Sequence, residues 1–128
     1  MAVRSIGFVG MRTERFDETV KLFRDVVGAA ITRRNKDMAA FKFTDGTAFE
    51  VYGPGDAFHA FFSTGPVVGF RVQDFDATRS AMVFAGVRFI GNPQHENGTS
   101  WQHFHCPDGT IAEIIGTGVG LHRRQVRI

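Results

Sequence analysis

The sequence predicts an α+β fold of two tandem βαβββ modules that form a concave eight-stranded mixed sheet. Three observations lead to this prediction: an internal repeat, alternating apolar patterns typical of strands, and two Asp-Gly turns at matching places in the repeat. The chain has 128 residues, of which 43% are hydrophobic and 22% are charged. A globular chain of this size buries about two-thirds of its surface and folds without a metal or a disulfide.

Two blocks of sequence in the first half of the chain recur in the second half. Residues 9–20 read VGMRTERFDETV and residues 68–79 read VGFRVQDFDATR, with six of the twelve positions identical. Residues 45–53 and 108–116 then share Asp-Gly-Thr, a glutamate and a final glycine. Repeated blocks that keep their order and spacing indicate two copies of one supersecondary unit.

Each copy is expected to contain a strand, a helix and three further strands. Apolar and polar residues alternate in Ser5–Thr13 and Pro66–Gln73, which predicts the first strand of each copy. A helix is expected to follow this strand. An acidic residue is favourable at the start of a helix, and a glycine is common at its end. The last two strands are joined by Asp-Gly, a strong hairpin signal. The residues that mark the helix boundaries are Asp17 and Gly28 in the first copy, and Asp74 or Asp76 and Gly86 in the second.

The repeat divides the chain into a first module at residues 5–53, a connector at 54–65, a second module at 66–116 and a basic tail at 117–128. The connector carries Phe58, Phe61 and Phe62. These rings are expected to cap the trough formed by the paired modules, to bury against another subunit in a homodimer, or to pack over the edge of the core.

Composition also bears on partners and compartment. A single cysteine, Cys106, excludes an intrachain disulfide and fits a reducing compartment. With no signal peptide and no apolar stretch long enough to span a bilayer, a cytoplasmic protein without a membrane partner is expected. The last twelve residues hold three arginines and no acid, so the excess of positive charge in the chain comes from this tail. Because no basic stripe runs across the rest of the chain, no nucleic-acid partner is expected.

Strand alternation assigns residues to the two faces of the predicted sheet. Arg12 and Arg71 belong to the set that faces the trough. If Asp45-Gly46 is a two-residue turn, Phe41 and Phe43 share the face of Glu50, and the same register places Phe104 and Cys106 with Glu113. Two arginines and two glutamates then form either structural ion pairs or an anchor for a small polar ligand. The predicted ligand-binding residues are Phe8, Arg12, Phe41, Glu50, Val67, Arg71, Trp101, Phe104 and Glu113.

Three histidines are candidate metal ligands. His103 and His105 lie on one face of a predicted strand, a spacing that metal sites use, and His95 precedes them. If Asp108-Gly109 is a two-residue turn, the side chains of His103 and His105 point away from Glu113. This register favours a packing role or a contact with a dimer partner for the two histidines over a metal-binding role. A slip of one residue in this strand reverses the face.

The sequence resembles the vicinal oxygen chelate superfamily, which includes glyoxalase I, bleomycin-resistance proteins and extradiol dioxygenases. The resemblance rests on the doubled unit, on VGFRVQDFD at residues 68–76 and on WQHFHCPDGTIAE at residues 101–113. It implies metal ligands on the first and last strand of each module. Glu50 and Glu113 match the last-strand positions, but Phe8 and Val67 stand where the family has histidines. The resemblance therefore favours the metal-free branch of the family.

Three functions follow as hypotheses. The first is a binding protein that holds a small polar or aromatic molecule in its trough with no cofactor. The second is a metal-dependent lyase, isomerase or dioxygenase, with Glu50 or Glu113 as general base and a divalent metal held through His103, His105 or His95. The third is a structural or regulatory dimer that binds no ligand.

Overall fold

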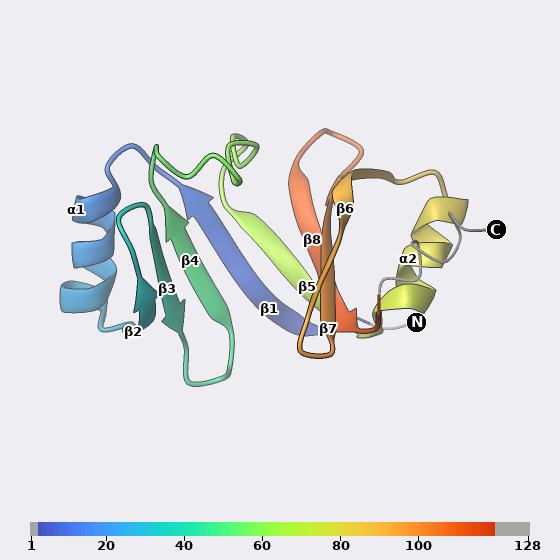
Figure 1. The fold of residues 1–128 in the computed structure, drawn as a ribbon, viewed down its shortest axis with the longest axis horizontal. Coiled ribbons are helices and arrows are strands. Elements are labelled where there is room, and N and C mark those ends of the chain that lie inside the picture. Colours follow the sequence, from blue (N-terminus) through green and yellow to red (C-terminus); the bar gives the residue numbers. More distant parts are fainter. Residues whose placement is uncertain (1–2, 120–128) are drawn as a thin grey trace. The chain divides into compact units, whose positions relative to one another are not determined.

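The computed structural model describes residues 3–119 and contains eight strands and two helical segments within that range (Figure 1). The described chain divides into two compact units. The first unit is residues 7–68, and the second combines residues 3–6 with residues 69–119.

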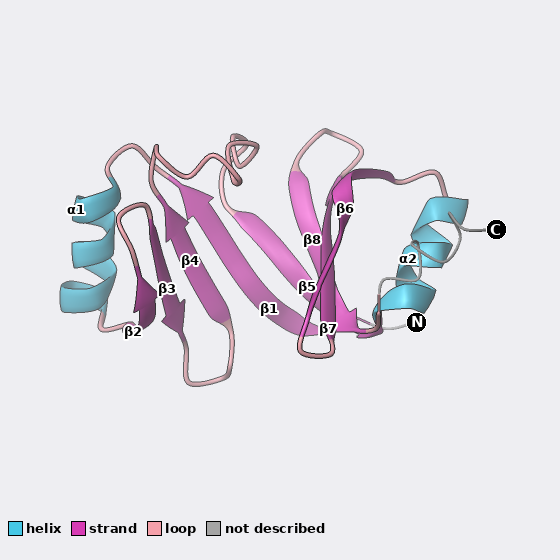
Figure 2. Ribbon diagram, viewed as in Figure 1, coloured by secondary structure: helices cyan, strands magenta, loops and turns pink. Residues whose placement is uncertain are grey.

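The first module has all the elements of a βαβββ unit, and residues 3–6 of its first strand belong to the second unit. Figure 2 distinguishes its strands from its helical segment. The strand order is β2-β3-β4-β1, with β1 parallel to β4 and the other neighbours antiparallel. The elements are β1 (Val3–Arg12), α1 (Phe16–Lys21), the π-helical continuation η1 (Leu22–Val27), β2 (Ala30–Arg34), β3 (Met38–Lys42) and β4 (Ala48–Tyr52).

The second module repeats this order of elements. Its strand order, β5-β8-β7-β6, matches that of the first module when equivalent strands are compared. The prediction of two tandem βαβββ modules is therefore confirmed. The elements are β5 (Val67–Asp74), α2 (Phe75–Phe84), β6 (Arg88–Glu96), β7 (Thr99–His105) and β8 (Ile111–Thr117).

The helix boundaries follow local chemistry. Asp74 is the N-cap of α2, and its Oδ1 accepts a hydrogen bond of 3.0 Å from the Ala77 amide. This satisfies one of the amides that the first turn of a helix leaves unpaired. Gly28 and Gly86 follow the helical segments with φ of 89° and 84°, a left-handed conformation that glycine adopts without steric cost.

The helical segment of each module packs on one face of its strands. In the first module, Phe16 and Val20 of α1 pack against buried residues of β3 and β4, among them Phe41 and Phe49. In the second, Phe75 of α2 packs with Val72 and Ile114, with Phe104 at the edge of the cluster. Phe41 and Phe104, predicted to line the ligand face, therefore belong to the helix-packed face.

The turn between the last two strands explains this correction. Each Asp-Gly sequence lies in a three-residue turn, because the Phe43 amide donates to Thr47 O at 2.9 Å and the Cys106 amide to Thr110 O at 2.8 Å. Three-residue hairpin turns place a left-handed residue last, and Gly46 and Gly109 each have φ of 90°. The predicted two-residue turn is wrong by one residue, and this shift moves every side chain of the preceding strand to the opposite face.

The polar stretch Gly91–Gly98 is largely strand. It continues β6 through a register irregularity between Ile90 and Gln94 and ends in a tight turn at Asn97-Gly98. Both turn residues have positive φ, 52° and 80°, as the common two-residue hairpin turn requires.

Two further observations concern the ends and the environment of the chain. Most of the predicted basic tail, residues 120–128, lies outside the described residues. Among residues 3–119, no helix combines the length and the apolar character needed to span a membrane.

Candidate functional site

The face of the first module opposite α1 carries three of the predicted site residues. The parallel register of β1 and β4 pairs Gly10 with Glu50 and Arg12 with Tyr52. Phe8, Gly10 and Arg12 therefore share a face with Glu50 and Tyr52. This face assignment agrees with the sequence prediction for Phe8, Arg12 and Glu50.

Arg12 and Glu50 do not pair with each other in the described structure. The Arg12 Nη2 donates to the carbonyl oxygen of Pro54 at 3.0 Å, and the Tyr52 hydroxyl donates a short hydrogen bond to Glu50 Oε1. Sequence reasoning missed Tyr52, although its position two residues after Glu50 on a strand places both side chains on one face.

The second module brings together a histidine and a glutamate that the sequence prediction separated. The register of β7 and β8 pairs His103 with Glu113. The His103 Nε2 lies 3.0 Å from Glu113 Oε2, and the side chains are 9% and 5% exposed. The contact has the distance of an ion pair without the alignment of a hydrogen bond. The prediction that His103 and His105 point away from Glu113 is therefore wrong.

The donors needed for a metal site are incomplete in the described part of the chain. No group of three or more His, Cys, Asp or Glu side chains lies close enough there to hold an ion. His95 Nδ1 is 2.8 Å from Ser100 Oγ, and Ser100 points to the opposite face of β7 from His103. His103 and Glu113 thus supply two donors, fewer than the three protein ligands of a typical catalytic zinc site.

Arg71 lines a pocket of about 410 Å³ that belongs entirely to the second unit. The lining contains two guanidinium groups and no carboxylate. The Arg71 Nη1 donates to Ser5 Oγ at 2.7 Å, which holds the arginine in place. The pocket is lined by Arg4, Arg71, Val72, Gln73, Thr99, Ile115, Gly116 and Thr117.

The same face of the second module connects this pocket to the His103–Glu113 pair. Ile115 lines the pocket and pairs with Trp101, and the next pair on that face along the two strands is Glu113 and His103. Two residues along a strand span about 7 Å. The His103–Glu113 pair therefore lies one residue pair beyond Ile115 on this face, outside the lining of the pocket.

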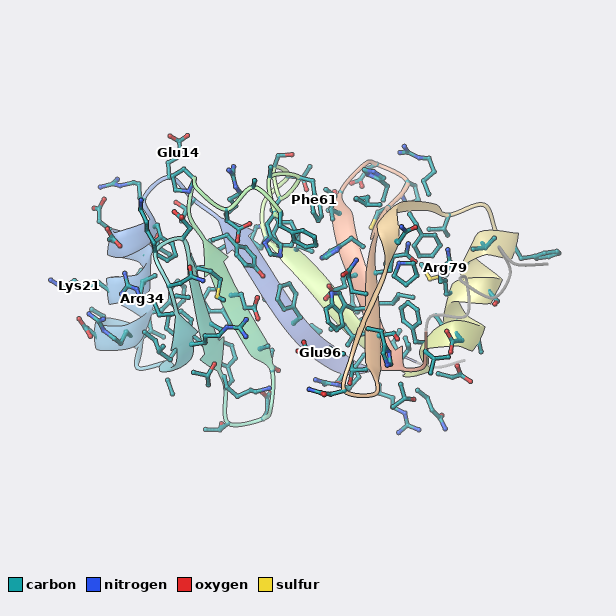
Figure 3. All side chains as sticks on the ribbon, viewed as in Figure 1. Glu14, Lys21, Arg34, Phe61, Arg79 and Glu96 are labelled. Atoms are coloured by element: carbon teal, nitrogen blue, oxygen red, sulfur yellow. The ribbon has the colours of Figure 1, made fainter. Side chains whose placement is uncertain are left out.

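Arg79, labelled in Figure 3, lies on the α2 side of the second module. Its Nε donates to Gln102 Oε1 at 2.8 Å, and its guanidinium lies 5.1 Å from the centre of the Phe89 ring. Partial burial lowers the pKa of this guanidinium. Arg79 therefore supports the packing of α2 and is separate from the arginines of the pocket.

Comparison with known proteins supports the fold alone. No family model and no curated protein matches the chain. Among solved structures, methylmalonyl-CoA epimerase from Mycobacterium tuberculosis has a TM-score of 0.69 at 18% identity, covering 94% of this chain and 93% of that one. A variant of the Streptomyces coelicolor methylmalonyl-CoA epimerase, in complex with 2-nitronate-propionyl-CoA, has a TM-score of 0.67 at 18% identity, covering 92% and 100%.

A third match, a hypothetical protein from Bacillus halodurans, has a TM-score of 0.68 at 11% identity, covering 90% of this chain and 95% of that one. Methylmalonyl-CoA epimerase is a member of the vicinal oxygen chelate superfamily, and the fold of this chain is similar to the fold of that enzyme. This confirms the fold that the sequence resemblance implied.

Proposed function

We propose that the protein binds a small anionic molecule through the pocket of Arg4 and Arg71, without the metal of its fold family. The observation that carries the proposal is the lining of this pocket, where two guanidinium groups are present and no carboxylate is. Guanidinium groups bind carboxylates and phosphates through paired charge-assisted hydrogen bonds. The anion of a ligand supplies the negative charge that the lining lacks.

The rest of the pocket suits a ligand that is only partly charged. Ile115 and Val72 provide apolar contact, and the Thr99 side chain adds a hydroxyl group to the lining. The volume of about 410 Å³ falls within the range of small-molecule sites. Proteins of the same fold have been solved with methylmalonyl-CoA and with 2-nitronate-propionyl-CoA, so an acyl-CoA or another carboxylate- or phosphate-bearing metabolite is the ligand class to test first.

The experiment compares anionic and neutral probes by isothermal titration calorimetry. Methylmalonyl-CoA, coenzyme A and pyrophosphate are the anionic probes, and pantethine is the neutral one. Because a hydrogen bond to a charged group contributes about 1.5–3 kcal/mol, Arg71→Gln is expected to weaken anion binding about 10- to 100-fold. The matched control is Arg24→Gln, which removes a guanidinium paired with Asp25 on the other unit. Equal binding by Arg71→Gln and wild type, or equal binding of pantethine, contradicts the proposal.

A second candidate is a metal-dependent lyase, isomerase or dioxygenase, and the His103–Glu113 contact of 3.0 Å favours it. In this hypothesis Glu113 is the general base, and a divalent metal takes further ligands from the substrate or water. Metal titration separates the two candidates, since stoichiometric binding of Zn²⁺ or Co²⁺ that His103→Ala abolishes supports the enzyme.

A further inference from the structure

The hairpin between β6 and β7 ends in an exposed turn whose amide is free. Glu96, labelled in Figure 3, pairs with Thr99, so Asn97 and Gly98 lie beyond the last pair of the two strands. Both turn residues are exposed to solvent. In a two-residue turn of this kind, the amide of the second residue takes no part in the pairing of the strands. Within residues 3–119, the Gly98 amide accordingly has no hydrogen-bond acceptor.

The Asn97 side chain is also free within the described part of the chain. Asparagine side chains in turns commonly bond to the backbone two residues further on. Asn35 does so, because its Oδ1 accepts a hydrogen bond of 2.9 Å from the Asp37 amide. The Asn97 carboxamide has no such partner among residues 3–119. Its position in space is therefore not fixed by a contact with the rest of the hairpin.

The two Asp-Gly turns have the opposite arrangement. In each of them the glycine amide donates to the carbonyl oxygen three residues earlier, at 2.9 Å for Gly46 and 2.8 Å for Gly109. The aspartate in each accepts from the amide two residues later, at 2.9 Å for Asp45 and 3.0 Å for Asp108. The side chain and the following backbone nitrogen are thus both held in these turns, whereas both are free at residues 97 and 98.

We propose that Asn97-Gly98 is a site of spontaneous backbone modification in the folded protein, where water converts the asparagine to aspartate and isoaspartate. Asparagine is among the chemically labile side chains, and glycine places no side chain beside the nitrogen that must approach it. A Cβ atom at position 98 would meet no other atom within 4 Å, so solvent reaches this nitrogen without obstruction.

The reaction needs only water and hydroxide. Hydroxide removes the proton of the Gly98 amide, and the nitrogen attacks Cγ of Asn97. The new N–Cγ bond closes a succinimide ring, the Cγ–Nδ2 bond breaks, and the nitrogen of the side chain takes up a proton from water and leaves as ammonia. Water then opens the ring at Cγ to give aspartate, or at the backbone carbonyl carbon to give isoaspartate. No atom is oxidised or reduced.

Isoaspartate lengthens the backbone of the turn, because the chain then runs through Cβ and Cγ of residue 97. The length of a hairpin turn fixes the register of its strands. The extra backbone carbon is therefore expected to disturb the pair of Glu96 and Thr99. In the isolated isoaspartate form, the NMR signal of the Thr99 amide is expected to shift and that of Gly46 to stay in place. A Thr99 signal that does not move contradicts this effect.

The test of the site is made on the folded wild-type protein, which is incubated in mildly alkaline buffer and then analysed by peptide mass spectrometry. The peptide with residue 97 is expected to gain the mass that separates a carboxylate from a carboxamide, and an isoaspartate-specific methyltransferase is expected to label it. The other two asparagines are internal controls, since Asn35 is hydrogen-bonded and Asn92 precedes Pro93, which has no amide proton. An unmodified residue 97, or equal modification of all three asparagines, overturns the proposal.

Two further comparisons show whether the fold selects this turn. In urea, the restraints on the two Asp-Gly turns are lost, so Asp45 and Asp108 are expected to form isoaspartate there and not in the folded protein. Equal isoaspartate at all three turns of the folded protein contradicts the proposal. Asn97→Gln keeps the carboxamide on a longer side chain that cannot close the same ring, and it is expected to lose the signal. The matched control, Asn35→Gln, is expected to keep it.

Discussion

Asp108 shows how one side chain holds the turn before β8. Its Oδ1 accepts a hydrogen bond of 3.0 Å from the Thr110 amide. Hydrogen bonds from the Thr110 amide and side chain lower the pKa of this carboxyl, because they favour its charged form. Asp45 makes the equivalent bond to the Thr47 amide at 2.9 Å in the other hairpin.

The Asp108 bond predicts a pH dependence of definite sign. A carboxyl whose pKa is lower in the folded state stabilises the fold above the pKa of the unfolded chain, about 3.9. That contribution is lost as the pH falls through the lower, folded value. NMR titration of the Asp108 carboxyl carbon is expected to give a pKa below 3.9, and Thr110→Pro, which removes the amide donor, is expected to raise it. A pKa at or above 3.9 in the wild-type protein contradicts this account.

At the scale of the element, the hairpin register decides which residues can meet a ligand. The turns hold three residues, so Phe41 pairs with Phe49 and faces α1, while Ala40 pairs with Glu50. Alternation along the strands is visible in the sequence, but the length of an Asp-Gly turn is not, since both two- and three-residue turns accept glycine at φ near 90°. One residue of turn length moved Phe41 and Phe104 to the helix side, and His103 to the side of Glu113.

The register is tested by a pair of phenylalanines in the first hairpin. Phe41 is 1% exposed and packs with Phe23 and Phe49, whereas Phe43 is 38% exposed at the start of the turn. Removing a buried phenylalanine side chain costs about 3–5 kcal/mol. Phe41→Ala is therefore expected to lower the free energy of unfolding by this amount in urea denaturation, and Phe43→Ala by clearly less. Equal losses would indicate that Phe41 is not in the core of the first module.

The connector illustrates the same limit of prediction for a whole segment. Its phenylalanines indicated a cap, a subunit contact or packing over the core edge, and the sequence offered no means of choosing. The structure seats Phe62 over Gly10 and His59 on Tyr52. His59 and Tyr52 carry no sequence signal of contact, since they are neither a motif nor a periodic pair, and only the folding of the connector onto the sheet brings them together.

At the scale of the molecule, the donor chemistry predicts a protein that needs no metal. Phe8 and Val67 cannot bind an ion, and no three donors gather among residues 3–119. Dialysed protein is expected to contain far less than one divalent metal per chain by elemental analysis, and EDTA is expected to leave pyrophosphate binding and the melting temperature unchanged. A stoichiometric metal that survives dialysis, or a fall in melting temperature with EDTA, would favour the metal-dependent enzyme. Formation of a homodimer stays a prediction, which light scattering tests.

The sequence by itself determined the duplicated architecture, the order of elements in each module and the face that carries Arg12 and Glu50. These features depend on repetition and on strand alternation, which are properties of nearby residues. Only the tertiary structure decided that Glu113 meets His103, that Arg71 shares a pocket with Arg4, and that the connector covers Tyr52. Such contacts depend on turn length and on packing between residues distant in the chain, where a shift of one residue changes which side chains meet.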